Sequence, residues 1–186
     1  MNEYFFSDEK DVFYLDSAEV YLDDVIENCE YKDMVILHKL QLLSYQRNYK
    51  KALNIIDSNK WDIDTITTPY FISVLKKRFE AMQLLFNNDT LAYNNTIKSI
   101  VSELDNFLIP HKQEVDSVLR LSQEEMIKSP LWFPILQYYY YKFILFSPKE
   151  VKKELDVLEK SGVNKDVIDW FLTPKEDDKF LNYEVF

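Results

Sequence analysis

Residues 130–146 read PLWFPILQYYYYKFILF, and eight of these seventeen residues are aromatic. Lys142 is the only charged residue among them. Ser129 and Pro130 form a typical helix start, because Ser caps the first backbone N–H groups and Pro lacks the N–H that the first turn leaves unpaired. A helix that is apolar on nearly every side has to be covered by other helices. The stretch is shorter than the roughly 20 residues that span a bilayer, so we predict the central helix of a bundle.

The composition of the whole chain also indicates a helical fold. Of its 186 residues, 47% are hydrophobic and 16% are aromatic, which excludes a disordered chain. Gly162 is the only glycine, whereas doubly wound nucleotide-binding folds and β-sandwiches need glycines in their turns and phosphate loops. We therefore predict an all-α fold of about eight helices. Two arrangements stay open, a single multi-helix bundle and a short stack of helical hairpins.

Capping signals mark where several of these helices begin and end. Asp16 followed by Glu19 is a capping box, so we expect a helix to begin at Asp16. Gly162 is expected to follow the end of another helix, where glycine adopts the left-handed conformation at little cost. The other expected helix starts are Thr68-Pro69, Asp89 or Thr90, Ser122 and Ser147-Pro148.

The connections between the expected helices are short, and the sequence shows no linker. We therefore expect one domain over residues 1–186. Within it, residues 1–15 form an arm docked on the body or a short first helix, and residues 174–186 form a C-terminal tail. The N-terminal segment lacks the basic and apolar regions of a signal peptide, so we expect a cytoplasmic protein.

Residues 48–53, Asn-Tyr-Lys-Lys-Ala-Leu, place Tyr49 three residues before the small Ala52. In this spacing the hairpin over residues 34–59 resembles a tetratricopeptide repeat, in which a Tyr precedes a small Ala where two helices approach closely. The upstream positions are apolar without the Trp or Gly of that family, and no second copy follows at a period of about 34 residues. The resemblance implies a helical scaffold or adaptor that holds a peptide in a multi-protein complex.

No group of residues in the sequence indicates catalysis or metal binding. His38 and His111 are the only histidines and Cys29 is the only cysteine, and none of them has a second Cys or His at the spacing of a metal site. Gly-rich phosphate loops and the motifs of hydrolases and metalloproteases are absent from the sequence. We therefore expect no enzymatic activity, no cofactor and no metal.

The negative charge of the chain is concentrated near its N-terminus. The net charge is −10, and residues 1–33 hold eleven acids against two lysines. The rest of the chain is close to neutral, with 21 acids and 20 bases. This distribution disfavours nucleic acid and an anionic membrane surface as partners, and it favours a basic protein. The densest basic run, Lys76-Lys77-Arg78, lies inside an expected helix, and we interpret it as a solvated helix face.

The candidate binding site is an acidic stripe along the first long helix. At about 100° per residue the acids of the stripe gather on one side of the helix, away from its apolar face of Ala18, Leu22, Val25 and Cys29. No lysine within the helix compensates them, and like charges four residues apart cost a few tenths of a kcal/mol each. A solvated face that aids solubility is one interpretation, and a face that meets a basic partner is the other. The stripe consists of Asp16, Glu19, Asp23, Glu27 and Glu30.

These features predict a non-enzymatic protein-binding module, monomeric or weakly dimeric. Its most concrete form is an immunity or antitoxin protein that covers the basic groove of a cationic toxin such as a nuclease, because the chain resembles such proteins in size, acidity and lack of catalytic motifs. The alternative is the tetratricopeptide-like scaffold or adaptor. An enzyme whose site the sequence does not reveal is the third hypothesis.

Overall fold

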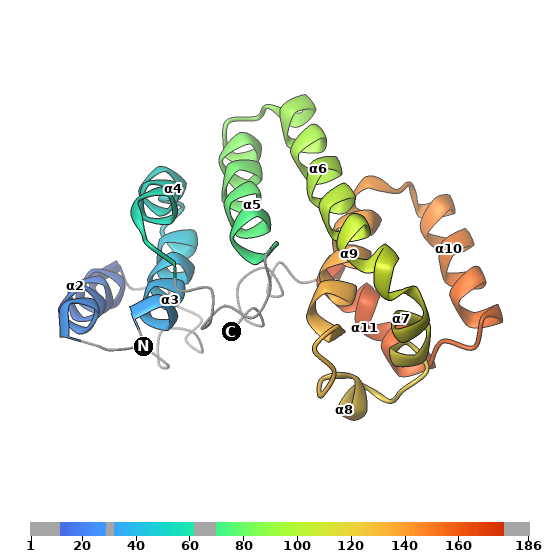
Figure 1. Cartoon of the computed structure of the whole chain (residues 1–186). Coiled ribbons are helices and arrows are strands. Elements are labelled where there is room, and N and C mark those ends of the chain that lie inside the picture. The colour runs from blue at the N-terminus through green and yellow to red at the C-terminus, as the bar shows by residue number, and fades with distance from the viewer. Residues whose placement is uncertain (1–11, 29–31, 62–69, 177–186) are drawn as a thin grey trace. The chain divides into compact units, whose positions relative to one another are not determined.

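The computed structural model describes residues 12–28, 32–61 and 70–176, and within these ranges every element is helical (Figure 1). The prediction of an all-α fold is confirmed. The packing of the backbone separates the chain into two compact units that divide between Ile72 and Ser73. We refer to them as the N-terminal unit and the C-terminal unit and describe each by itself. The single domain over residues 1–186 stays a prediction.

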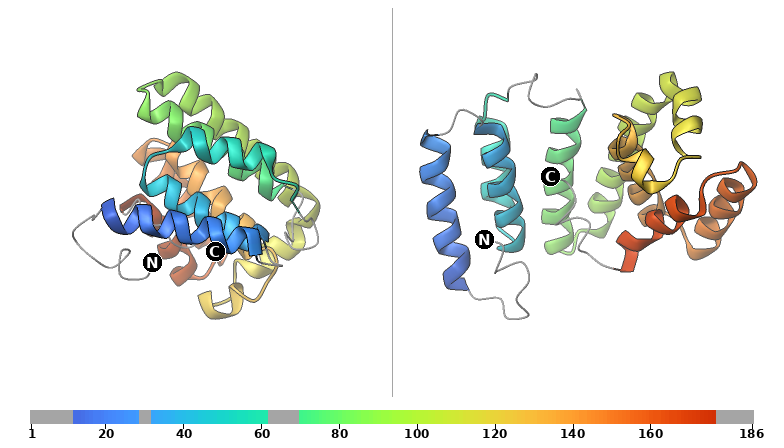
Figure 2. Two further views of the ribbon diagram at one scale, coloured as in Figure 1. Left: turned by 90° about the vertical axis from the view of Figure 1, so that its left-hand side faces the viewer. Right: turned by 90° about the horizontal axis from the view of Figure 1, so that it is seen from below.

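The N-terminal unit contains three helices, α2 (Val12–Asn28), α3 (Lys32–Tyr45) and α4 (Tyr49–Ser58). Helix α2 packs along α3, which packs in turn against α4 (Figure 2). The Asn48 side chain caps α4 by accepting a hydrogen bond from the Lys51 backbone N–H. The apolar side chains of α2, α3 and α4 that are at most 7% exposed are Leu22, Ile36, Leu37, Leu40, Leu42, Leu43, Tyr49, Ala52 and Ile56.

The C-terminal unit holds the remaining helices, and the first of them begins at the boundary between the units. Helix α9 packs against both α6 and α11, and α10 packs against α11. The elements in chain order are α5 (Phe71–Phe86), α6 (Thr90–Leu108), the 3₁₀ helix η1 (Ile109–His111), α7 (Lys112–Val118), α8 (Gln123–Met126), α9 (Trp132–Leu145), α10 (Pro148–Lys160) and α11 (Lys165–Glu176).

Helix α9 forms the core of the C-terminal unit, as the aromatic stretch predicts. Leu136 and Phe143 have no exposed surface, and the Tyr139 ring stacks on the Phe171 ring of α11 with 4.5 Å between centroids. Lys142, the charged residue of the aromatic stretch, forms an ion pair at the edge of this core. Its ammonium lies 2.6 Å from a Glu154 carboxylate oxygen of α10. Among the described residues, no helix is long and apolar enough to cross a membrane.

Several of the expected helix boundaries are confirmed. The Asp89 side chain caps α6 by accepting a hydrogen bond from the Ala92 backbone N–H at 3.0 Å. Ser122 and Ser147 each form a capping box at the start of α8 and α10. Gly162 follows α10 with φ +83°, a left-handed conformation that favours glycine. These signals are reliable because each depends only on residues within one helical turn.

Other boundaries correct the sequence-based prediction. Helix α2 begins at Val12, so Asp16 lies inside the helix and is not its cap. The first turn of α2 therefore occupies residues 12–15 of the expected arm, where the sequence has no Gly or Pro to prevent a helix. Helix α11 continues to Glu176 and so takes the first residues of the expected tail, although Pro174 removes one backbone hydrogen bond in its last turn. The expected start at Thr68-Pro69 lies outside the described residues.

The start of α9 also differs from the expectation. The helix begins at Trp132, two residues after the expected Pro130. The Ser129 hydroxyl accepts a hydrogen bond from the Leu131 backbone N–H at 3.2 Å, and the Trp132 N–H donates to the Ser129 carbonyl at 3.2 Å. The Ser-Pro pair thus forms a turn that leads into the helix, and Pro134 falls in the first helical turn, where its missing N–H costs little.

The basic run of α5 is not the solvated face that the sequence predicts. The Lys77 ammonium lies 2.6 Å from a Glu103 carboxylate oxygen of α6, and the Ser73 hydroxyl donates to the same oxygen at 2.9 Å. Arg78 is only 8% exposed. The prediction is wrong for Arg78 because this residue lies on the inward side of α5.

Candidate protein-binding surface

Apolar side chains among the described residues join α2 to α3. Leu22 of α2, 5% exposed, packs with Leu42 of α3, 1% exposed. Ala18 and Val35 extend this contact as partly buried residues. Charged residues of α2 make further contacts with α3 and α4.

Glu19 is the first stripe acid with such contacts. Its carboxylate accepts hydrogen bonds from the Lys51 ammonium of α4 and, at 3.3 Å, from the Gln46 amide. Burial alone raises the pKa of Glu19, but these hydrogen bonds outweigh burial and hold the pKa below the ordinary value of 4.5. The hydrogen bond with Glu19 also raises the pKa of Lys51. Both groups are therefore charged at neutral pH and link α2 to α4.

Asp23 makes the second link. Its carboxylate forms an ion pair with the Lys39 ammonium of α3, whose side chain is 8% exposed, whereas the Asp23 side chain is 54% exposed. The absence of a lysine within α2 is thus compensated from α3 and α4. Sequence reasoning missed this compensation, because Lys39 lies 16 residues from Asp23 along the chain.

Of the other three acids of the stripe, the structure describes the side chain of Glu27 alone. Glu27 is exposed, near the C-terminal end of α2. Asp16 lies within α2, but its side chain is outside the described residues, as is the whole of Glu30. The stripe therefore divides into Glu19 and Asp23, which contact α3 or α4, and Glu27, which faces solvent.

The side of α2 that faces solvent carries a different set of residues, which we call the outer face. Val20 is 71% exposed and Tyr21 is 67% exposed, and the acids Asp24 and Glu27 are exposed beside them. At about 100° per residue these four positions fall within an arc of roughly 120°. The stripe predicted from the sequence does not include Asp24, and sequence reasoning overlooked Val20 and Tyr21. The sequence could have indicated Val20 and Tyr21, because they are large apolar residues outside the expected apolar face of this helix.

Removing the Asp23 carboxylate should destabilise the N-terminal unit more than removing the Lys39 ammonium. Asp23→Ala leaves a largely buried ammonium without its acceptor, which costs roughly 1–3 kcal/mol. Lys39→Met keeps the apolar stem and leaves a carboxylate that water can solvate, so the cost should stay below about 1 kcal/mol. Urea denaturation of both variants measures the two costs. Equal costs, or a larger cost for Lys39→Met, would contradict the pairing.

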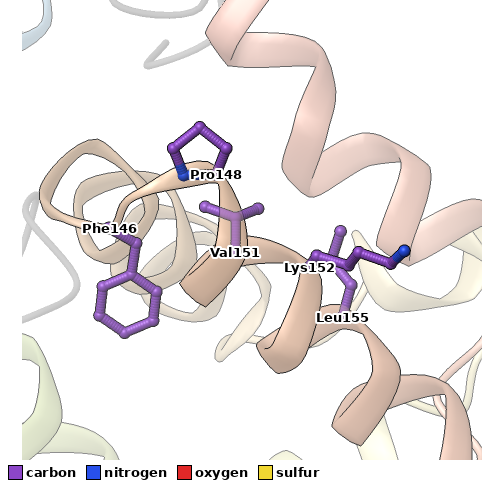
Figure 3. Close-up of a pocket in the computed structure, with 5 residues that line it drawn as sticks. All are labelled: Phe146, Pro148, Val151, Lys152 and Leu155. Atoms are coloured by element: carbon purple, nitrogen blue, oxygen red, sulfur yellow. The ribbon is translucent and has the colours of Figure 1, made fainter.

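The surface also has a shallow hollow of about 350 Å³ on the C-terminal unit, where α9 leads into α10. Figure 3 shows its lining, with the Lys152 ammonium far from the Phe146 ring. The lining has one ionisable group and four apolar side chains, so it offers no converging polar groups for catalysis. The lining residues are Phe146, Pro148, Val151, Lys152 and Leu155.

The described residues with metal-binding chemistry do not gather into a metal site. His38 is partly buried, and His111 is exposed with its Nδ1 3.7 Å from a Glu114 oxygen. Cys29 lies outside the described residues. Among the residues that are described, no group of three or more His, Cys, Asp or Glu side chains is placed to hold a metal ion.

Comparisons of the chain with protein-family models, with curated proteins and with solved structures gave no match. The outer face of α2 combines exposed apolar side chains with negative charge, and we consider it the candidate functional site.

Proposed function

We propose that this chain is a non-enzymatic protein-binding module that docks the outer face of α2 on a basic protein. The exposure of Val20 and Tyr21, 71% and 67%, is the observation that supports this proposal most directly. Single exposed apolar residues are ordinary on a protein surface. Here an aliphatic and an aromatic side chain, at consecutive positions of α2, share one exposed arc of the helix with the acids Asp24 and Glu27.

The chemistry of this face matches that of a protein interface. Tyr is enriched at the centres of interfaces, because its ring provides buried area and its hydroxyl a hydrogen bond. Charges at the rim add little to affinity but select the partner and speed the encounter. The acids of the outer face, Asp24 and Glu27, are exposed, so the partner that fits this face is basic around an apolar contact.

The most concrete form of this proposal is a cytoplasmic immunity or antitoxin protein. Such a protein neutralises a cationic toxin, for example a nuclease, by covering the basic surface that binds nucleic acid. The concentration of negative charge in residues 1–33, eleven acids against two lysines, supports this form. A steep electrostatic field also favours rapid capture, which a neutraliser of a toxin needs.

The second candidate function is a tetratricopeptide-like scaffold or adaptor. Its support is the hairpin of α3 and α4, in which Tyr49 is 7% exposed and Ala52 has no exposed surface. A small residue at this position allows two helices to approach closely. In this case a peptide partner would bind the hairpin, and changes on the outer face of α2 would leave binding intact.

Affinity capture from the native host with the full-length chain tests the proposal. A double variant, Val20→Ser with Tyr21→Ser, should lose the captured protein while retaining its fold, because both side chains are largely exposed. Leu91→Ser, at a position 75% exposed on α6, is the matched control and should retain it. A captured protein that is acidic, or one that the double variant retains fully, would contradict the proposal.

A further inference from the structure

The hollow where α9 leads into α10 has walls that the core of the C-terminal unit holds in place. Phe146 forms one wall, and its ring centroid lies 6.4 Å from that of the buried Phe143 and 5.6 Å from the Lys142 ammonium. Val151, in another wall, is 8% exposed. Figure 3 shows Phe146 and Leu155 at opposite ends of the lining. The volume of about 350 Å³ is near the lower end of the range for ligand pockets, about 300–1,000 Å³, so the hollow has room for one large apolar side chain.

Three exposed lysines of α10 adjoin this hollow. Lys149, Lys152 and Lys153 all lie in the first two turns of the helix, and each side chain is exposed. At about 100° per residue the three positions fall within an arc of roughly 100°. This arc begins beside the arc that holds Pro148 and Leu155 of the hollow. An apolar hollow with positive charge along one edge results.

The acids of α10 that lie nearest to these lysines are engaged elsewhere. The Glu150 carboxylate accepts hydrogen bonds from the Ser147 backbone N–H at 2.8 Å and from the Ser147 hydroxyl at 2.6 Å. The Glu154 carboxylate pairs with the Lys142 ammonium of α9. Among the described residues, none forms an ion pair with any of the three lysines. Their charge is therefore available to a partner.

The extent of the basic edge indicates what kind of partner fits it. At a rise of about 1.5 Å per residue, Lys149 and Lys153 lie only about 6 Å apart along the helix axis. Two exposed acids, Asp156 and Glu159, follow on the same side of α10. A membrane surface or a nucleic acid would extend past the lysines and meet these acids, which repel it. A short acidic segment of a protein would not.

We propose that the hollow and its three lysines form a docking site for a short acidic segment of another protein. One large apolar side chain of that segment fills the hollow, and its carboxylates lie beside the lysines. The buried side chain contributes most of the affinity, while the charges select the partner and speed the encounter. This site lies in the C-terminal unit, and it is independent of the basic partner proposed for α2.

Nuclear magnetic resonance titration of the full-length, ¹⁵N-labelled chain tests the proposal. The probe is a synthetic heptapeptide with a central Phe and Glu at every other position. It should shift the backbone amide signals of residues 146–155. The same peptide with Ser in place of Phe should bind roughly 10- to 100-fold more weakly, because it lacks the side chain that the hollow buries. A peptide with Lys in place of every Glu should leave the signals unchanged.

Variants of the chain test the contribution of the lysines. Lys149→Gln, Lys152→Gln and Lys153→Gln together should weaken binding of the Phe peptide roughly tenfold at low salt. The fold should be retained, because all three side chains are exposed. The matched control removes the same charge from exposed positions elsewhere in the C-terminal unit and should bind as the unmodified chain does. It combines Lys98→Gln, Lys112→Gln and Lys128→Gln.

Three results would overturn the proposal. The first is that the Phe peptide leaves the signals of residues 146–155 unchanged. The second is that the two triple variants bind this peptide equally well. The third is that the chain ignores the peptide but sediments with phosphatidylserine vesicles or binds a single-stranded DNA oligonucleotide through the same three lysines, which would assign this surface to a membrane or to nucleic acid.

Discussion

Replacing Phe143 with alanine should lower the free energy of unfolding by roughly 3–5 kcal/mol. Phe143 has no exposed surface, and its ring lies 5.9 Å from the Tyr139 ring and 6.4 Å from the Phe146 ring, measured between centroids. Helix α9 packs against both α6 and α11, so the space that the ring leaves can be filled only if several helices move. Urea denaturation followed by circular dichroism, with linear extrapolation to water, measures the loss.

Phe86→Ala is the matched control for this experiment. It makes the same chemical change at the end of α5, at a side chain that is 58% exposed. Its cost should stay below about 1 kcal/mol, because the ring is already largely in water. If Phe143→Ala costs as little as the control, α9 is not the core of the C-terminal unit.

Reversing the charge of Asp24 and Glu27 together should slow association with the proposed basic partner by roughly tenfold or more. Exposed charges act over a Debye length of about 8 Å at physiological ionic strength, so their main effect is on the encounter rate. Both side chains are exposed on the outer face of α2, and Lys is a good helix former. The fold of the double variant should therefore be retained. From the sequence alone, Asp23 and Glu27 would be the natural pair to change, but Asp23→Lys would place a second ammonium beside Lys39.

Surface plasmon resonance against the captured partner measures this effect. The association rate of the Asp24→Lys, Glu27→Lys variant should be low at low salt and should approach that of the unmodified chain at high salt. Asp156→Lys with Glu159→Lys is the matched control, because it makes the same change of charge at the same spacing on the exposed side of α10. Equal association rates for the two double variants would mean that α2 does not guide the partner.

The sequence by itself determined the all-α class, several helix boundaries and the place of the aromatic helix. The capping boxes at Ser122 and Ser147 and the turn at Gly162 were predictable, because each involves residues within a single turn. The core position of α9 was also predictable, since a helix that is apolar on nearly all sides has no face suited to water. The start of α2 was predicted wrongly, because a capping box such as that at Asp16 is only a local preference. Without a Gly or Pro before Asp16, the helix begins earlier in the sequence.

Only the tertiary structure decided which charges are neutralised and which remain available to a partner. Asp23 meets Lys39 and Glu19 meets Lys51 across 16 and 32 residues of sequence, and no periodicity within α2 contains that information. The burial of Arg78 was likewise not predictable from the sequence. Which residue of a basic run points inward depends on where the neighbouring helices pack. The physical reason is that the state of a charge depends on the solvent and the counter-charges around it. The packing of the other helices decides how far solvent reaches a charged side chain and which counter-charges lie beside it.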